Sequence, residues 1–284
     1  MTDLPTPIPT PGSLLRKYGL SPRKSWGQNF LHDVRVHEEI VAASGAAPGR
    51  RVVEIGAGLG TLTMHLLASG AEVWAIERDR DLCGVLRAEL GGVDRFQLFE
   101  ANAITYDYAQ AKPATGRVAV VGNLPYQITG ELLFALLDHD EVTDTWVVMV
   151  QQEVADRLCA SPGNKQYGAP TVSLGRTRRM ERVCHVGPGS FLPPPRVQST
   201  VVALHPLPSP RGEVGDPAGF RALVRAAFGQ RRKTLLNSLS VLADKSQVRD
   251  WCDAAGVSSS ERPERLEPEA FAALQRARES ADHA

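Results

Sequence analysis

The chain of 284 residues has few cysteines, no excess of either charge and no long apolar run. Its four cysteines form no CxxC pair and have no clustered histidines around them, which argues against a zinc site and a disulfide framework. No uncharged apolar run approaches the roughly 20 residues that span a bilayer, and the N-terminus has no signal-peptide core. These absences predict a cytoplasmic protein without a metal or a membrane. The formal net charge of +0 requires any nucleic-acid contact to come from local basic patches.

What is present indicates a folded chain of two parts. Hydrophobic residues make up 43% and charged residues 23%, as in globular proteins. Residues 1–12 alternate proline with small residues, which predicts a disordered lead-in. Proline and glycine mark a linker at 206–217, so we expect one domain over 13–205 and, over 206–284, the linker and a small helical domain.

Strand and helix patterns alternate in the first part, which predicts an α/β fold with a parallel, doubly wound sheet. Apolar, β-branched runs predict strands, and helical spacing with capping residues predicts helices. The expected strands are 52–55, 72–76, 96–99, 118–122, 146–150, 181–186 and 197–204. The expected helices are 33–43, 61–67, 79–89, 128–137, 152–159, 217–228, 235–239 and 269–278.

A glycine loop, 56–60, lies between the first of these strands and the helix that follows it. Glycine lets the backbone turn tightly and lets a ligand approach closely. Glu77 ends the next strand, about 20 residues later, where a carboxylate can accept hydrogen bonds from ribose hydroxyls. The loop reads G-x-G-x-G, and Thr61 holds the position of the third glycine of dinucleotide sites. This spacing favours an adenosylmethionine site over a dinucleotide site.

Two further stretches carry amides that can reach such a cofactor. Asn102 follows the third strand and can contact an adenine ring. Gln28 and Asn29 precede a helix capped by Asp33, on a loop that either closes over a ligand or makes ordinary turn hydrogen bonds. The sequence alone leaves that choice open.

The tetrapeptide Asn123-Leu124-Pro125-Tyr126 follows an apolar strand. The Asn123 oxygen and a backbone carbonyl, that of Leu124, can accept the two N–H bonds of an exocyclic purine amine. Pro125 stiffens the turn, and Tyr126 offers a stacking face for a base. An ordinary strand-ending turn uses the same residue types, so the motif alone does not decide.

Two more features fit an RNA substrate without requiring one. Phe191 stands in a proline-rich loop, either as a second stacking face opposite Tyr126 or as a core residue. Basic residues gather in two groups, which fit an RNA backbone or a solvated surface. The groups are Arg176, Arg178, Arg179 and Arg182, and Arg221, Arg225, Arg231, Arg232 and Lys233.

Seven motifs stand in the order found in the ribosomal RNA adenine dimethyltransferases, and the bacterial small-subunit type is the most similar. The resemblance is strong over about 13–205 and looser beyond. The motifs are QNFL at 28–31, VEIGAGLGTLT at 53–63, ER at 77–78, NLPY at 123–126, QQEVADRL at 151–158, PGNKQYG at 162–168 and FLPPPRVQS at 191–199.

The resemblance implies a Rossmann-like class I methyltransferase sheet, mostly parallel with an antiparallel strand, and a small C-terminal all-helical domain. It implies S-adenosylmethionine-dependent N6,N6-dimethylation of two adjacent adenosines in the 3′-terminal hairpin loop of 16S rRNA. The partner would be the immature small ribosomal subunit, the enzyme a monomer, and its role small-subunit biogenesis.

The resemblance also assigns site residues. Asn123, Leu124, Pro125 and Tyr126 would be catalytic, with Tyr126 and Phe191 enclosing the target base. Arg221, Arg225, Arg231, Arg232 and Lys233 would bind RNA. The cofactor would contact Gln28, Asn29, Leu31, Glu54, Gly56, Gly58, Glu77, Asn102 and Asn123.

The chain departs from the family where Asn102 replaces a usual Asp, where Gln127 and Gly130 follow the NLPY motif, and where Gln198 replaces a common Asp. These differences affect loop detail and cofactor affinity more than reaction type. The alternatives are a macrolide-resistance methyltransferase of large-subunit rRNA, an assembly factor whose methylation is incidental, and a nicotinamide-dependent oxidoreductase. The FLPPPRVQS and PGNKQYG segments favour the small-subunit enzyme over the first, and the glycine spacing disfavours the last.

Overall fold

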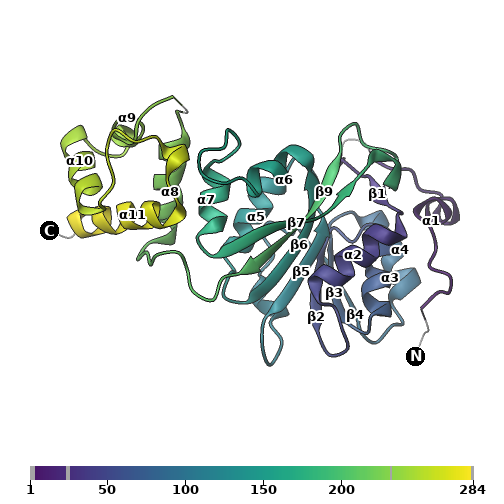
Figure 1. Cartoon of the computed structure of the whole chain (residues 1–284). Coiled ribbons are helices and arrows are strands. Elements are labelled where there is room, and N and C mark those ends of the chain that lie inside the picture. Colours follow the sequence, from purple (N-terminus) through teal and green to yellow (C-terminus); the bar gives the residue numbers. More distant parts are fainter. Residues whose placement is uncertain (1–3, 24–25, 231, 283–284) are drawn as a thin grey trace. The chain divides into compact units, whose positions relative to one another are not determined.

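Short apolar runs of the chain form a seven-stranded sheet in the computed structural model, which describes residues 4–23, 26–230 and 232–282. The order across the sheet is β4-β3-β2-β5-β6-β9-β7 (Figure 1). The strands are β2 (Arg51–Ile55), β3 (Glu72–Glu77), β4 (Phe96–Glu100), β5 (Val118–Asn123), β6 (Thr143–Gln151), β7 (Arg178–Val186) and β9 (Ser199–Pro206).

Pairing within this sheet is parallel from β4 through β6, and β9 runs antiparallel to β6. The predicted mostly parallel sheet with an antiparallel strand is therefore confirmed. Val52, Val53 and the run 118–121 are fully buried, because strands covered on both faces carry continuous apolar side chains. Each predicted strand is present, and β6 and β7 begin three residues earlier than expected.

Helices flank this sheet (Figure 1). Asp33 and Asp79 accept a hydrogen bond from a backbone N–H of the first turn of α2 and α4, as N-caps do. A small second sheet pairs β1 (Phe30–Leu31) antiparallel with β8 (Phe191–Leu192). The helices are α1 (Pro11–Tyr18), α2 (Val34–Ser44), α3 (Thr61–Ala68), α4 (Arg80–Leu90), α5 (Thr129–Leu137) and α6 (Gln152–Leu158).

The described part of the proline-rich lead-in is not disordered, so that prediction is wrong for residues 4–12. Leu4 and Ile8 pack against the main apolar core. Thr10 caps α1, which begins at Pro11, a position where proline's missing N–H costs nothing. The apolar residues spaced between the prolines explain the difference, since burying them offsets the cost of ordering the segment. Residues 1–3 lie outside the described part of the chain.

The chain divides into two compact units, residues 1–155 with 181–205, and residues 156–180 with 206–284. The expected boundary at 205/206 coincides with one junction between them. The segment 156–180, expected within the first domain, belongs to the second unit. Tyr167 and Val172 are buried in that unit's apolar core, and the Tyr167 hydroxyl donates to the Leu266 carbonyl.

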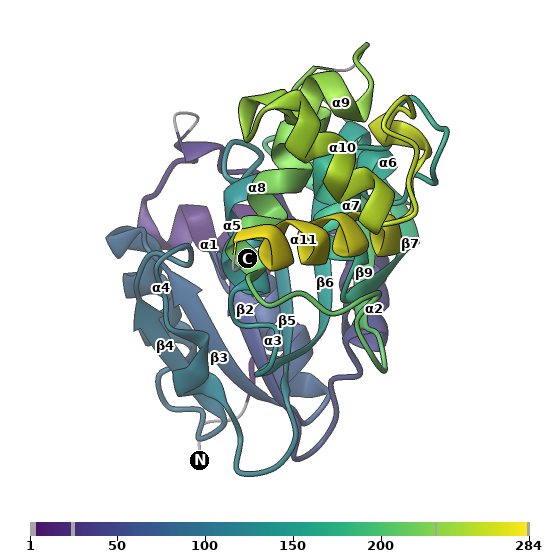
Figure 2. The same ribbon diagram turned by 90° about the vertical axis from the view of Figure 1, so that its left-hand side faces the viewer.

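The second unit is built of helices around its own core (Figure 2). Phe220, Leu223 and Phe271 are almost fully buried there. Its helices are α7 (Ala169–Gly175), α8 (Pro217–Phe228), α9 (Leu235–Ser238), α10 (Lys245–Ala254) and α11 (Pro268–Asp282), of which α7 and α10 were not predicted.

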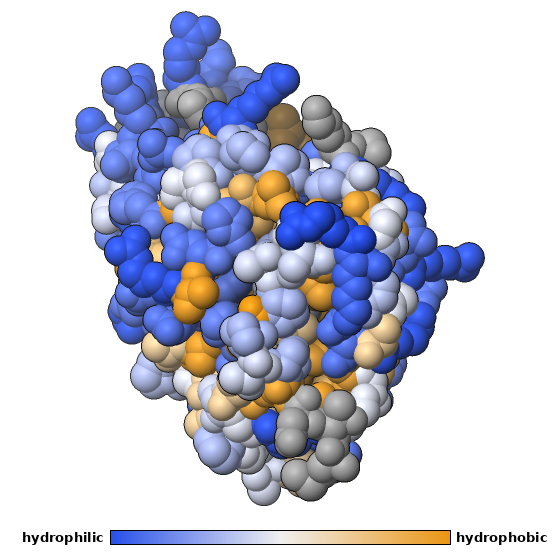
Figure 3. All heavy atoms as spheres, turned by 90° about the vertical axis from the view of Figure 1, so that its right-hand side faces the viewer, coloured by the Kyte–Doolittle hydropathy of each residue, from blue (hydrophilic) through white to orange (hydrophobic). Residues whose placement is uncertain are grey.

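Hydrophilic side chains cover much of the face in Figure 3, and hydrophobic ones show as scattered small groups between them. Large exposed apolar residues among those described include Trp26, Val34, Leu192, Val197 and Val241. Isolated exposed apolar residues are normal, and of these five residues only Trp26 lines the cavity described below. Within the described ranges, the helices are too short or too polar to cross a membrane.

Candidate active site

A cavity of about 310 Å³ lies at the carboxyl ends of the parallel strands. Gly56 follows β2, Glu77 ends β3, Asn102 follows β4 and Asn123 ends β5, and all four line it. Open α/β sheets bind ligands at this edge, because the loops leaving adjacent strands frame a crevice there. The cavity joins residues predicted to hold a cofactor with those predicted to hold a target base.

The glycine loop is fixed to the end of β3 by the Glu77 carboxylate. Gly58 N–H donates to Oε2 at 2.9 Å, and the N–H groups of Arg78 and Asp79 donate to Oε1 at 2.8 Å. Burial raises the pKa of Glu77, although the three backbone hydrogen bonds act in the opposite direction and lower it. Gly56 and Gly58 have φ of +68° and +61°, a region that favours glycine. Three of about four acceptor sites of the carboxylate are used, so one remains for a ligand hydroxyl.

Glu54 lies beneath this loop on β2 and is 2% exposed. The Thr63 hydroxyl donates to its Oε2 at 2.6 Å. Burial raises the pKa of Glu54 to about 8, although the Thr63 bond lowers it, and the charge of Glu77 raises it further. Glu54 is therefore mostly protonated at neutral pH, and it lines the cavity as a neutral carboxylic acid.

The tetrapeptide 123–126 forms a turn that leaves the end of β5. The Asn123 amide donates from Nδ2 to the Asn29 carbonyl at 2.9 Å. The Pro125 carbonyl accepts from Ile128 N–H and the Thr129 hydroxyl, each at 3.1 Å. No hydrogen bond to the Leu124 carbonyl occurs among the described residues, so this carbonyl and Asn123 Oδ1 are the available acceptors.

The two predicted stacking residues do not line the cavity together. Tyr126 is half-buried in the wall, and its hydroxyl is 2.8 Å from the Ser199 hydroxyl, which fixes the ring. Phe191 is 3% exposed, pairs with Leu31 in the β1–β8 sheet and belongs to the main core. The structure thus has Phe191 in the core position, and a stacking role for it stays a prediction.

Asn102 and Leu31 line the cavity as predicted. The Asn102 side chain is exposed, and its Oδ1 accepts from Ile104 N–H at 3.1 Å, so the amide is oriented by its own turn. Leu31 is buried, and its carbonyl accepts from the Thr61 hydroxyl. The bond joins the start of α3 to the small sheet, which holds this wall of the cavity.

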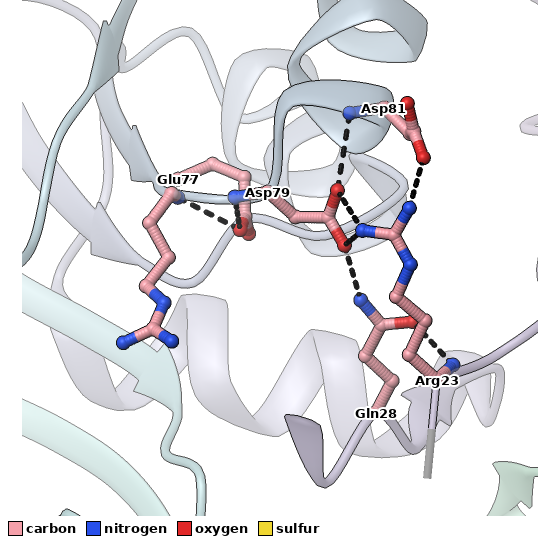
Figure 4. A network of polar contacts seen from close by, with 6 residues as sticks. Arg23, Gln28, Glu77, Asp79 and Asp81 are labelled. Carbon is pink, nitrogen blue, oxygen red and sulfur yellow. Dashed lines mark hydrogen bonds and ion pairs between the residues drawn. The ribbon is translucent and has the colours of Figure 1, made fainter. Parts of the chain in front are cut away.

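Gln28 lines the cavity, yet both ends of its amide are engaged elsewhere (Figure 4). Its Oε1 accepts from Arg23 N–H at 2.8 Å, and its Nε2 donates to Asp79 Oδ2 at 2.7 Å. Asp79, 2% exposed, also receives both Arg23 Nη1 contacts at 2.9 Å. The Gln28 amide is therefore not free to bind the cofactor as predicted, and the predicted contact would have to come from other atoms of this residue.

Sequence reasoning missed several cavity residues. Trp26 carries the Arg78 guanidinium 4.6 Å from its ring centroid, and both line the cavity. His37 also lines it, and neither of its ring nitrogens has a hydrogen-bond partner among the residues that the structure describes. Burial lowers the pKa of His37 to about 3, so the ring is neutral. Asp79, two residues after Glu77 and at the start of α4, does not line the cavity but supports it from outside.

The predicted basic groups have mixed outcomes. Arg225, Arg232 and Lys233 are exposed and Arg221 is partly exposed, whereas Arg231 lies outside the described residues. Arg178 is fully buried, so it cannot belong to an exposed footprint with its neighbours. Across the described ranges, no group of three or more His, Cys, Asp or Glu side chains is placed to hold a metal ion.

The cavity fits an adenosine-type cofactor. A Cβ on Gly56 would meet only the Asn123 carbonyl, at 3.8 Å, so the glycine leaves open the space that both residues line. The volume is at the lower end of the range for small-molecule sites. A carboxylate at one strand end, glycines at another and amides at two more supply acceptors and donors for a nucleoside with an amino-acid tail. Fold and site together define a class I methyltransferase.

Comparisons with known proteins identify the family. The model of "Ribosomal RNA adenine dimethylase" matches residues 19–276. The "Ribosomal RNA small subunit methyltransferase A" of Anaeromyxobacter sp. (strain K) is 46% identical over 279 residues, 94% of this chain and 97% of the relative. The protein of the same name from Pseudomonas aeruginosa is 42% identical over 252 residues, 89% of this chain and 92% of the relative. The chain belongs to the ribosomal RNA adenine dimethylase family.

Solved structures agree on the fold. A dimethyladenosine transferase from Plasmodium falciparum superposes with a TM-score of 0.74 at 24% identity, covering 89% of this chain and 98% of that one. The 23S rRNA methyltransferase ErmE superposes with a TM-score of 0.66 at 25% identity, covering 88% and 99%. The protein is thus an rRNA adenine methyltransferase whose methyl donor is S-adenosylmethionine.

Proposed function

We propose that the protein converts two adjacent adenosines in the 3′-terminal hairpin loop of small-subunit rRNA to N6,N6-dimethyladenosine. The observation that carries the proposal is the single cavity shared by Glu77 and the Asn123–Tyr126 turn. The name of the relatives at 42–46% identity supports the small subunit as the target. We further propose that the protein acts as a cytoplasmic monomer on immature subunits, through Arg221, Arg225, Arg232 and Lys233.

The cofactor residues each have a defined task in this proposal. Bound S-adenosylmethionine supplies an electrophilic methyl group on a sulfonium. Glu77 accepts from a ribose hydroxyl with its remaining acceptor site, and Asn102 faces the adenine end. Gly56 leaves room for the amino-acid part, beside Leu31 and neutral Glu54, whereas a Cβ on Gly58 would lie 3.3 Å from the Phe30 ring.

The turn residues make the target amine reactive. The N6 lone pair of adenine is delocalised into the ring, which makes the amine a weak nucleophile. Asn123 Oδ1 and the Leu124 carbonyl accept its two N–H bonds, so the lone pair can point along the line of transfer. Tyr126 stacks on the extruded base, an interaction worth about 1–3 kcal/mol. As the new N–C bond forms, the bond between the methyl carbon and sulfur would break and leave its electron pair on sulfur. The amine is then positively charged and loses a proton to water.

The test uses purified protein, labelled S-adenosylmethionine and ribosomal subunits that lack the modification. Mass spectrometry of the rRNA should locate dimethyladenosine at two adjacent positions of small-subunit rRNA. An Asn123→Ala variant should lose about 10²–10³-fold in kcat, the cost of removing one preorganised electrostatic group. Full activity of Asn123→Ala would contradict the assigned mechanism.

Two controls separate the alternatives. Labelling of large subunits instead of small ones would favour the macrolide-resistance type. In cells lacking the gene, rescue of subunit maturation by the inactive Asn123→Ala protein would mean that binding matters more than methylation.

A further inference from the structure

The segment from Trp26 to Asn29, here called the crossing segment, joins two sides of the cavity. All four of its residues line the cavity wall. On one side, Gln28 Nε2 donates to Asp79, just beyond the end of β3. On the other side, the Asn29 carbonyl accepts from Asn123 Nδ2, at the end of β5. The cofactor end and the target end of the cavity are therefore linked through a few residues of main chain.

The Asn29 carbonyl decides which atom of the Asn123 amide faces the substrate. A carbonyl oxygen can only accept, so the group that meets it at 2.9 Å must be the NH₂ group. Oδ1 is then left without a hydrogen-bond partner among the described residues. A flipped amide would offer donors to an amine whose N–H groups also donate. The orientation therefore sets whether Asn123 can hold the target amine.

Asp79 holds the crossing segment in place. Its buried carboxylate accepts from Gln28 Nε2 at 2.7 Å and from Arg23 Nη1 at 2.9 Å (Figure 4). Arg23 and Gln28 are in turn joined, because Arg23 N–H donates to Gln28 Oε1 and Gln28 N–H donates to the Arg23 carbonyl. Charge-assisted bonds to a buried carboxylate are strong and directional, so one group fixes both residues.

We infer that Asp79 is a positioning residue for methyl transfer, which acts by fixing the crossing segment so that the Asn29 carbonyl orients the Asn123 amide. Asp79 itself is not among the residues that line the cavity. Its effect reaches the reacting amine only through Gln28, Asn29 and Asn123. The inference rests on the proposed role of Asn123.

The test variant is Asp79→Asn. Asp79 is also the N-cap of α4, through Asp81 N–H at 3.0 Å, and asparagine caps helices as well as aspartate. The helix start is kept, but the amide has one oxygen where the carboxylate used two. Either the Asp81 N–H of the cap or the Gln28 Nε2 group then faces an NH₂ group, which cannot accept its hydrogen bond. The matched control is Asp81→Asn, because Asp81 also pairs with Arg23 but is half-exposed and does not touch Gln28.

Single-turnover rates at saturating cofactor and RNA give the readout. Asp79→Asn should lower the rate roughly 10- to 100-fold, the size expected from a misplaced catalytic group. Asp81→Asn should stay near wild type. In an Asn123→Ala background, Asp79→Asn should lower the rate no further, because its route to the substrate is already removed.

Three results would overturn the inference. The first is a rate loss of Asp79→Asn that persists in the Asn123→Ala background. The second is a rise only in the Kd of S-adenosylhomocysteine with an unchanged saturated rate, which would make Asp79 a support of the cofactor site alone. The third is a fully active Asn123→Ala protein, which refutes the proposed mechanism as well and so is distinguishable from the first two. Should Asp79→Asn fail to fold, Gln28→Leu removes the same link without touching the cap and is judged by the same criteria.

Discussion

Glu54→Gln should remove a specific dependence of stability on pH. Glu54 is 2% exposed, and burial raises its pKa from the usual 4.5 to about 8. The folded protein therefore holds the Glu54 proton more tightly than the unfolded chain does. A group with a raised pKa contributes its full stability below the unfolded pKa and loses it as pH rises through the folded pKa. Glutamine has no proton to lose, and its Oε1 can still accept from the Thr63 hydroxyl.

The size of the effect follows from the two pKa values. Each pKa unit is worth about 1.4 kcal/mol, so the whole shift corresponds to roughly 5 kcal/mol across the window between about pH 4.5 and about pH 8. Between about pH 5 and about pH 7.5, the wild type should lose about 3 kcal/mol relative to Glu54→Gln. Below the unfolded pKa the difference between the two proteins should be flat, because Glu54 is protonated in both states.

Urea unfolding of both proteins across this pH range measures the difference in the free energy of unfolding. Hydrogen exchange of β2 peptides assigns the change to the first unit, since two units need not unfold together. Thr63→Val is a useful companion, because the Thr63 bond lowers the Glu54 pKa and its loss should extend the pH dependence to higher pH. A difference between wild type and Glu54→Gln that does not change with pH would refute a neutral, buried Glu54.

Three other changes have defined outcomes. His37→Leu should raise the free energy of unfolding by about 1–3 kcal/mol, measured by urea unfolding, because both buried ring nitrogens lack partners; a loss of stability would contradict this. Gly122→Ala should cost about 1–3 kcal/mol in the same assay, since a Cβ would lie 2.6 Å from the Ile55 carbonyl oxygen of the neighbouring strand, and an unchanged midpoint would argue against that contact. Cys83 is fully buried and its pKa is raised to about 11 by burial, so mass spectrometry should find it unalkylated at neutral pH until the protein unfolds.

Local sequence patterns predicted most elements of the first unit. The run 118–122 is apolar, and Val52–Ile55 is apolar apart from Glu54; both are rich in β-branched residues and end at a glycine, which favours a buried strand. The predicted helix caps Asp33 and Asp216 are N-caps in the structure, and the helix expected from Asp79 has that residue as its N-cap.

The missed helices had weaker patterns. Helix α10 is polar along most of its length, and its local signals are the capping box, Asp244 with Gln247, and the helical spacing of Val248, Trp251 and Cys252. Helix α1 begins at the end of a proline-rich run that indicated disorder. The packing of Leu14 and Leu15 into an apolar cluster stabilises this helix. Short helices depend on tertiary packing, so local composition alone does not reveal them.

By itself, then, the sequence determined the strand–loop–helix unit with Glu77 at its end, the Asn123–Tyr126 turn and, through the ordered motifs, the family. These depend on residues close together in the chain, whose backbone preferences and spacing act locally. The tertiary structure alone decided that Phe191 lies in the core, that the Gln28 amide is engaged by Asp79, and that the Asn29 carbonyl orients Asn123. The two hydrogen bonds join residues that are 51 and 94 positions apart in the chain, and Phe191 reaches the core from a distant loop. Such contacts form only when the strand order of the sheet has brought these segments together.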